Sequence, residues 1–430
     1  MWKGVRALIF AGPAAGVFRG MATLALGSGA ARLIGIASIP ILTRIYSPED
    51  FGALAVFTAL VALLAPILTW RYVLAIPLPR HDGLAMNLLV LSVALMLATM
   101  LVLTAVLWAF AAPLLRALSM ETLVPWWWLV AMGLLAAGTY EMLTLWATRK
   151  RAYKIIAQTS VWQSAAGAIV KIALGLLTLK PAGLLIGQVV ANGGGIGSLL
   201  RSFRADFSTS WRHLRLGRMK KLAVRHRGFP IYRVPSQVLM VGSTQAPLLF
   251  VAALFDAPTT GQLGLALMAL ALPVQLFGRT MARAFYAETA NLGNRKPQEI
   301  RRIANHVLMR LAILSLPPSL ILFFFAPNLF PLVFGAEWEM AGNFASLLAI
   351  YLFFQFIQTP VVHIFYLFDS QGALLYLNAQ RIILISGCFF AAYLQTLSSS
   401  EAISIYAVIL AMHYAFSIVY ALKLIPTGKQ

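Results

Sequence analysis

The sequence predicts an all-α, polytopic membrane protein of about twelve transmembrane helices, arranged as two lobes of six. Composition is the first observation: of 430 residues, 60% are hydrophobic and only 11% are charged, and the mean hydropathy is +0.82. Soluble domains carry roughly 25% charged residues. The second observation is that the apolar residues form long blocks, which are separated by short basic segments.

A transmembrane helix needs about 20 mostly apolar residues. Twelve blocks meet this requirement, and they run over roughly 20–43, 51–70, 84–112, 124–147, 155–178, 181–200, 234–256, 260–282, 305–327, 340–368, 374–396 and 402–422. The blocks 84–112 and 340–368 are longer than a bilayer requires. We therefore expect these two helices to tilt or to extend beyond the membrane.

The distribution of basic residues predicts the orientation in the membrane. If the N-terminus is inside, nearly all Lys and Arg residues outside the blocks fall on the inner side, ten of them within 201–233. The outer loops then hold only three basic residues, Arg44, Arg116 and Lys180, together with seven acids. Cytoplasmic loops carry such an excess of Lys and Arg. Both termini are therefore expected in the cytoplasm.

The same pattern predicts the organisation of the chain. Residues 1–18 include an apolar stretch of signal-peptide length, but no small-residue cleavage site follows, so we favour an uncleaved cytoplasmic arm. The predicted parts are the arm at 1–18, an N-lobe at 19–200, a basic cytoplasmic connection at 201–233, a C-lobe at 234–424 and a tail at 425–430.

Several function classes are disfavoured. The net charge of +21 does not indicate nucleic-acid binding, because the basic residues lie between apolar blocks and not on one face of a soluble fold. The single Cys388 allows no internal disulfide, and the histidines have no metal-ligand spacing. Residues 192–197 are rich in glycine but lack the lysine of a phosphate-binding loop. We therefore expect no metal, no cofactor and no enzymatic centre.

Three charges are predicted to lie in the hydrocarbon, namely Arg32, Glu141 and Lys171, whereas Arg71 and Arg381 are counted among the basic residues of the inner side. A charge at the centre of a membrane helix costs about 2.5–3.5 kcal/mol on insertion scales. These side chains should therefore face one another or a hydrated cavity. Glu141 either carries a proton in a coupled cycle or is a static partner of Lys171 or Arg32.

Three further arginines, Arg279, Arg283 and Arg310, lie near the predicted inner ends of the eighth and ninth helices. Together with Arg32 and Lys171 they could form a cationic vestibule, which suits an anionic substrate such as a pyrophosphate. The alternative is that these three arginines only anchor their helices at the membrane interface.

Three stretches resemble the Wzx-type O-antigen and polysaccharide flippases of the MOP (multidrug, oligosaccharidyl-lipid and polysaccharide exporter) superfamily. They are ILTRIYSPEDFG at 41–52 followed by RYVLAIPLP at 71–79, GFPIYR at 228–233 followed by AFYAE at 284–288, and VFGAEW at 333–338. They occur in the family's order. One departure is Val73, where relatives commonly have an acid.

The resemblance implies a MATE-like fold, in which two six-helix lobes form a V around a central cavity. It also implies an undecaprenyl-pyrophosphate-linked glycan as substrate, moved from the cytoplasmic to the periplasmic leaflet of the bacterial inner membrane by alternating access. Cationic residues of relatives are thought to engage the pyrophosphate, a role for which Arg32, Lys171, Arg279 and Arg283 are the candidates here. A polysaccharide polymerase and a chain-length regulator are the implied protein partners.

Three alternatives remain. A drug or cation antiporter of the same superfamily is the nearest, although a cationic cavity would repel cationic drugs. A membrane-embedded glycan polymerase or ligase would be expected to carry a long outer loop, and every predicted outer loop is short. A structural scaffold would gain nothing from buried charge.

Overall fold

The structure is a computed structural model that describes residues 15–273, 278–292, 296–368 and 370–426. Within these ranges the chain is helical and contains no β-strand. The long helices are α2 (Ala15–Ile45), α3 (Pro48–Leu68), α4 (Asp82–Ala117), α5 (Trp127–Arg149), α6 (Tyr153–Leu176), α7 (Ala182–Gly193), α11 (Val234–Leu254), α12 (Ala257–Pro273), α13 (Arg279–Leu292), α14 (Pro297–Phe334), α15 (Glu339–Leu367), α16 (Gln371–Leu394) and α17 (Ser399–Leu424).

Each predicted apolar block coincides with helical structure, so the all-helical membrane fold is confirmed. Among the described residues, 10 helical segments are long and apolar enough to cross a bilayer. The two predicted blocks that do not meet both conditions are α6, which contains Lys154 and Lys171, and α12, of which 17 residues are described. The expected helical extension of the third block is also found, because α4 has 36 residues, or about 54 Å at 1.5 Å per residue.

The chain forms two compact units. Unit 1 holds the described residues up to Tyr46 together with Phe57–Ala117 and Glu121–Val238; unit 2 holds Ser47–Val56, Leu118–Met120 and the described residues from Leu239 onward. α2 begins at Ala15, which is ahead of the predicted start of the first lobe at 19. Most of the predicted arm, residues 1–14, lies outside the described residues.

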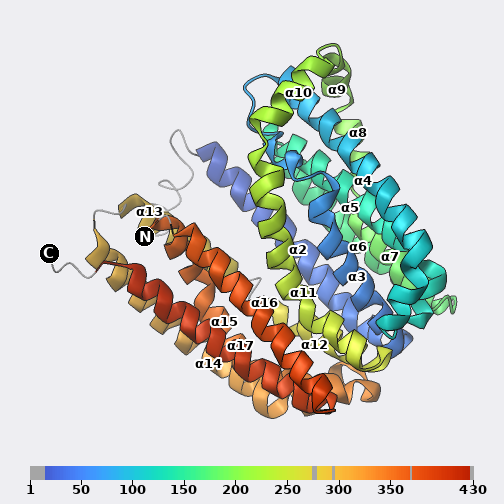
Figure 1. Ribbon diagram of the computed structural model, residues 1–430, viewed down its shortest axis with the longest axis vertical. Coiled ribbons are helices and arrows are strands. Elements are labelled where there is room, and N and C mark those ends of the chain that lie inside the picture. Colours follow the sequence, from blue (N-terminus) through green and yellow to red (C-terminus); the bar gives the residue numbers. More distant parts are fainter. Residues whose placement is uncertain (1–14, 274–277, 293–295, 369, 427–430) are drawn as a thin grey trace. The chain divides into compact units, whose positions relative to one another are not determined.

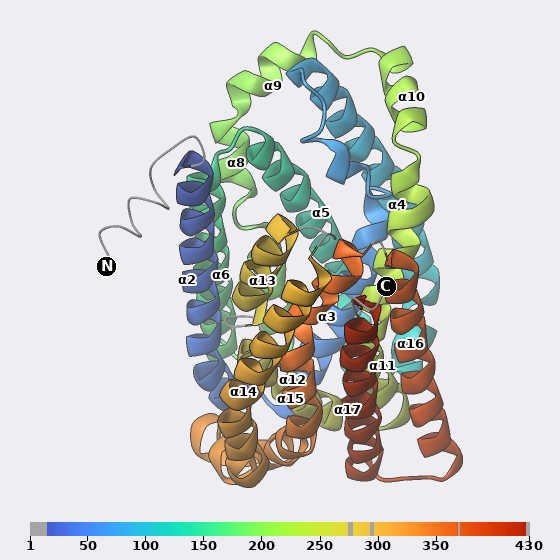
Figure 2. The same ribbon diagram turned by 90° about the vertical axis from the view of Figure 1, so that its left-hand side faces the viewer.

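In unit 1, α2 and α6 lie side by side (Figures 1 and 2). Small residues let the two backbones approach: a Cβ on Gly27 would come within 2.4 Å of the Ala157 Cβ, and one on Gly175 within 2.6 Å of the Ile45 side chain. Both contacts pair residues about 130 positions apart, so the two helices run parallel and in register. α7 also packs against α6.

In unit 2, the long helix α15 packs along both α14 and α17. The first turns of α3 closely approach the backbone of α12, since a Cβ on Gly261 would lie 1.8 Å from the Pro48 carbonyl oxygen. The Phe51 and Trp338 rings meet edge to face at 4.9 Å between centroids. This interdigitation of small and aromatic residues is typical of packing between membrane helices.

The basic connection contains secondary structure that the sequence analysis did not anticipate. Two short helices, α9 (Arg204–Trp211) and α10 (Leu216–Arg225), precede one π-helical turn at Phe229–Arg233, whereas α8 (Ile196–Ser202) largely completes the sixth predicted block. The buried amide of Asn87 on α4 donates to the His213 carbonyl at 3.1 Å and accepts from the Arg215 N–H at 3.1 Å. This side chain ties the connection to unit 1.

Candidate functional site

The acid inside the fourth predicted block, Glu141, is paired with an arginine from the loop that follows α3. Arg71 Nη1 lies 2.9 Å from Glu141 Oε1, and the two side chains are 14% and 32% exposed. Arg71 adopts a left-handed backbone conformation with φ of 59° at the start of the short helix Tyr72–Ala75. The sequence analysis had counted Arg71 as a loop charge and had considered only Lys171 or Arg32 as partners of Glu141.

The ion pair between Arg71 and Glu141 also relates to Val73, the position at which relatives of the flippase family commonly have an acid. Val73 is fully buried in the short helix, so an apolar residue suits this position. The acidic partner of Arg71 comes instead from Glu141 on α5. The pairing removes much of the cost of placing a carboxylate within a membrane helix.

Lys171 on α6 does not point to lipid but toward α7. Its ammonium donates to Gln188 Oε1 at 2.7 Å, and Gln188 Nε2 in turn donates to Asn192 Oδ1 at 3.2 Å. Gln163 Nε2 donates to the Asn192 carbonyl at 3.1 Å. These hydrogen bonds form a polar network between α6 and α7, and its only formal charge is the lysine.

A glycine makes room for this lysine. A Cβ on Gly187 would lie 2.3 Å from Lys171 Cγ and 3.0 Å from the Lys171 backbone nitrogen. The backbone of Lys171 has a partner as well, because the Tyr46 hydroxyl donates a hydrogen bond to the Lys171 carbonyl at 2.7 Å. The half-buried Lys171 thus forms hydrogen bonds through both its backbone and its side chain.

The end of this network borders a hollow of about 510 Å³ in unit 1. Its polar lining residues are Tyr140, Glu141 and Thr144 of α5 together with Gln163 and Asn192. Above it, the Tyr140 hydroxyl lies 3.1 Å from Thr159 Oγ1. The glycine-rich stretch lies here because α7 ends at Gly193 and α8 begins at Ile196, which interrupts the helix beside the hollow.

Arg32 is half-buried on α2. The parallel register of α2 and α6 places it level with about residue 162, whereas Lys171 lies nine residues further along α6. At 1.5 Å per residue this separates the two levels by about 13 Å along the helix axes. The two cations are therefore on neighbouring helices but at different depths.

The other three candidates lie in unit 2. α13 begins at Arg279 and includes Arg283, but the side chains of both arginines lie outside the described part of the structure. Arg310 is exposed in α14, immediately before a long stretch without charge. Its position favours the interpretation as an interfacial anchor.

Arg381 is a further arginine with polar partners inside a long helix. The sequence analysis had counted it among the basic residues of the inner side. Arg381 lies well inside α16, where its Nε donates to Ser243 Oγ at 3.1 Å, its Nη2 to the Met240 carbonyl at 3.4 Å and its Nη1 to the Tyr414 hydroxyl at 3.5 Å. Gln355 Nε2 also donates to that hydroxyl at 3.1 Å. The apolar sequence on both sides of Arg381 was the signal that could have identified it.

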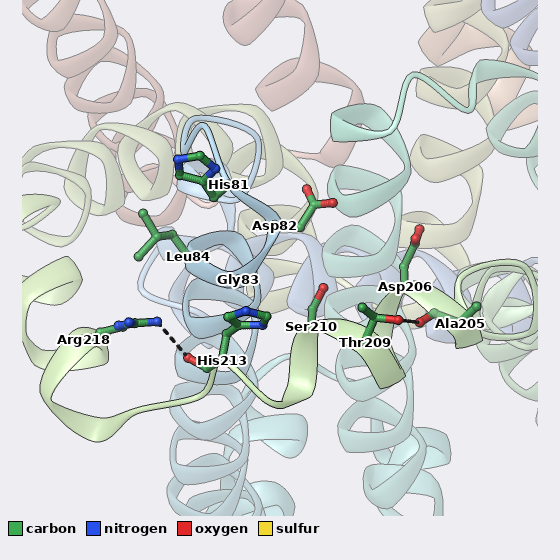
Figure 3. Close-up of a pocket in the computed structure, with 10 residues that line it drawn as sticks. All are labelled: His81, Asp82, Gly83, Leu84, Ala205, Asp206, Thr209, Ser210, His213 and Arg218. Atoms are coloured by element: carbon green, nitrogen blue, oxygen red, sulfur yellow. Dashed lines mark hydrogen bonds between the residues drawn. The ribbon is translucent and has the colours of Figure 1, made fainter.

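A second polar pocket, of about 700 Å³, lies where α4 begins and α9 ends (Figure 3). The carboxylates of Asp82 and Asp206 point to the same side of it, and Lys150 Nζ binds them at 2.7 and 3.2 Å. Burial alone would lower the pKa of Lys150, but the hydrogen bonds and charges of the two aspartates outweigh this effect and raise it. Arg149 also pairs with Asp82, at 2.8 Å.

The comparisons with known proteins concern both the sequence and the fold. The model of a family described as "Polysaccharide biosynthesis protein" matches residues 41–342. No curated protein matches the sequence.

Among solved structures, an inward-facing multidrug resistance transporter of the MATE family, in the MOP superfamily, is 13% identical over 95% of this chain and 96% of its own, with a TM-score of 0.60. A MATE protein in complex with MaL6 is 13% identical over 96% and 97% of the two chains, with a TM-score of 0.57. The Vibrio cholerae MATE transporter VcmN in its bent form is 16% identical over 94% and 98%, with a TM-score of 0.52.

At these low identities the solved structures establish the fold, while the family match covers most of the sequence. The chain therefore belongs to the polysaccharide biosynthesis protein family, and it is a multi-pass membrane protein with the fold of the MATE transporters.

Proposed function

We propose that the chain is a flippase for an undecaprenyl-pyrophosphate-linked oligosaccharide. It would move this lipid from the cytoplasmic to the periplasmic leaflet of the bacterial inner membrane by alternating access, driven by an ion gradient, with both of its termini in the cytoplasm. Bilayer lipids surround it, and a polysaccharide polymerase and a chain-length regulator are its proposed protein partners. The family assignment supports a role in polysaccharide biosynthesis.

Lys171 carries the proposal. This half-buried side chain hydrogen-bonds to the neutral amide of Gln188 and forms no ion pair with a described carboxylate. A cation within a membrane helix that has no counterion is costly, and a phosphate group supplies the missing charge. The hydrogen-bonded path through Gln188 and Asn192 links this charge to the wall of the 510 Å³ hollow.

The other cations have supporting roles in the proposal. Arg32 on α2, and Arg279 and Arg283 on α13, are proposed as further phosphate contacts. Glu141 is proposed as the coupling residue, since its carboxylate lines the hollow while Arg71 holds it in place. A proton or another cation that reaches the hollow would compete with Arg71 for this carboxylate.

The decisive experiment tests export of glycan in a strain that lacks the endogenous gene. Lys171→Met should abolish export while the protein still accumulates in the membrane, because the substituted side chain keeps the length but loses the charge. The matched control is Lys154→Met, at the exposed start of the same helix, which should support normal export. Normal export by the Lys171 variant would refute the proposal.

The same assay separates the other roles. Arg32→Ala should abolish export if this side chain contacts the substrate, and normal export would remove it from the site. In proteoliposomes, Glu141→Gln should lose uptake driven by an imposed ion gradient but keep exchange at equilibrium. Unchanged gradient-driven uptake would leave the Arg71–Glu141 pair with a structural role only.

The alternative function is drug or cation antiport, which the fold similarity to MATE transporters favours. The positively charged network around Lys171 argues against cationic drugs as substrates. Increased resistance of cells to cationic drugs on expression of the chain, without an effect on glycan export, would support this alternative.

A further inference from the structure

The helix α14 changes character at Arg310. Its first part carries the basic residues Arg301, Arg302 and Arg310, whereas Leu311–Phe334 contains no charged residue. This second part is about 36 Å long at 1.5 Å per residue, enough to cross a hydrocarbon core of about 30 Å. Arg310 therefore lies at the boundary where lipid headgroups begin.

A groove of about 450 Å³ starts one turn beyond this arginine. Leu314, Pro317 and Pro318 of α14 line one side, and the buried Leu352 and Phe356 of α15 line the other. The two helices pack along each other. The groove is almost entirely apolar, and all of its lining residues belong to unit 2.

The sequence explains why a space remains between two tightly packed helices. Ser315 and Ser319 place short side chains where larger ones would fill the gap. Next to them, Pro317 and Pro318 cannot donate backbone hydrogen bonds to the preceding turn, which loosens the helix at this point. The lining residue Leu314 is itself 53% exposed, and other apolar side chains of α14, such as Ile313 (65% exposed) and Ile321 (51% exposed), are exposed as well.

Arg310 is positioned to hold a charged group at the end of this groove. Residues three, four or seven positions apart lie on one side of a helix, so Arg310 lies on the same side as Leu314 and Pro317. Its side chain is exposed. A guanidinium binds phosphate oxygens through two parallel hydrogen bonds.

We propose that this groove holds one acyl chain of an anionic bilayer phospholipid, whose phosphate binds Arg310. The volume supports a single chain: 450 Å³ corresponds to about fifteen water-sized groups of about 30 Å³ each, and a methylene group is of similar size. A polyprenyl carrier is several times longer than this groove could enclose. The site is thus a lipid site separate from the one proposed around Lys171.

The test uses the full-length protein in nanodiscs that contain a trace of phospholipid with a photoreactive group at the end of one acyl chain. Phosphatidylglycerol should label peptides covering 314–322 and 352–356 about fivefold more than phosphatidylcholine does, which corresponds to about 1 kcal/mol per basic residue near an anionic lipid. Equal labelling by the two lipids would overturn the proposal.

Variants separate the headgroup contact from the groove. Arg310→Gln should reduce phosphatidylglycerol labelling to the phosphatidylcholine level, whereas Arg302→Gln, two turns earlier and also exposed, should leave it unchanged. Ser319→Leu should fill the groove and suppress labelling by both lipids, and Leu352→Trp is a second variant with the same expected effect.

A variant is taken as folded when it elutes as a single species in size-exclusion chromatography and its unfolding midpoint equals that of the unmodified protein. Labelling that persists in both groove-filling variants would contradict the proposal. Stronger labelling of the same peptides by a photoreactive polyprenyl phosphate than by phosphatidylglycerol would also contradict it and would assign the groove to the carrier lipid.

Discussion

The ion pair between Arg71 and Glu141 should make a measurable contribution to the stability of unit 1. Removing one partner of a fully buried pair costs about 3–5 kcal/mol, and an exposed pair is worth about 0–1 kcal/mol. At 14% and 32% side-chain exposure, the pair lies between these limits. We expect Arg71→Gln and Glu141→Gln each to lower the free energy of unfolding by about 1–3 kcal/mol.

A double-mutant cycle tests this value. The free energy of unfolding is measured in mixed detergent micelles for the two single variants and for the double variant. The double variant should lose less than the sum of the single losses, with a coupling energy of about 1–3 kcal/mol. The surface pair of Lys296 and Glu299, with side chains 57% and 54% exposed, is the matched control and should give about 0–0.5 kcal/mol.

Additive losses in the Arg71–Glu141 cycle would refute the reasoning. They would mean that the 2.9 Å contact contributes nothing beyond the separate environments of the two side chains. A coupling no larger than that of the surface pair would have the same meaning, because the argument depends on exclusion of water from the contact.

The remaining predictions concern packing, the connection between the units and topology. Gly187→Val should lower the free energy of unfolding by about 1–3 kcal/mol through overpacking against Lys171, whereas Gly197→Ala, where a Cβ meets nothing within 4 Å, should change it little; equal effects would contradict the packing argument. Lys150→Met should accelerate hydrogen exchange in α9, since it removes the bridge between two aspartates, and unchanged exchange would show that the bridge does not hold the helix. Because the pKa of Lys150 is raised, this bridge stays charged at neutral pH and is lost only as the pH rises through that pKa. Ser208→Cys in a Cys388→Ser background should resist an impermeant thiol reagent in intact cells, and labelling would reverse the proposed orientation.

The helical framework could be predicted because hydrocarbon imposes a simple requirement. Every backbone polar group must be satisfied within the segment that crosses the bilayer, so apolar length alone identifies most of the helices. Segments outside the bilayer do not obey this rule, and the short helices α9 and α10 were missed for that reason. Their placement depends on tertiary contacts such as those of Asn87.

The candidate site was predictable only in part. Lys171 and Glu141 could be identified because each interrupts a long apolar block, but a sequence does not specify which helix faces contact each other. The partner of Glu141 lies 70 positions away in a left-handed turn that no periodicity predicts. Arg381 was missed because it was counted among the inner-side basic residues although it lies within the block 374–396, and its hydrogen bonds place it among the helices of unit 2.

The amide partner of Lys171 has a consequence for how the protein is made. α6 is long enough to cross the bilayer but is not among the segments that are apolar enough to do so by composition. A nascent α6 that leaves the translocon alone would expose its ammonium to acyl chains. Gln188 follows 17 positions later, on the next helix. Entry of α6 and α7 into the lipid together, as one hairpin, would spare the lysine this exposure.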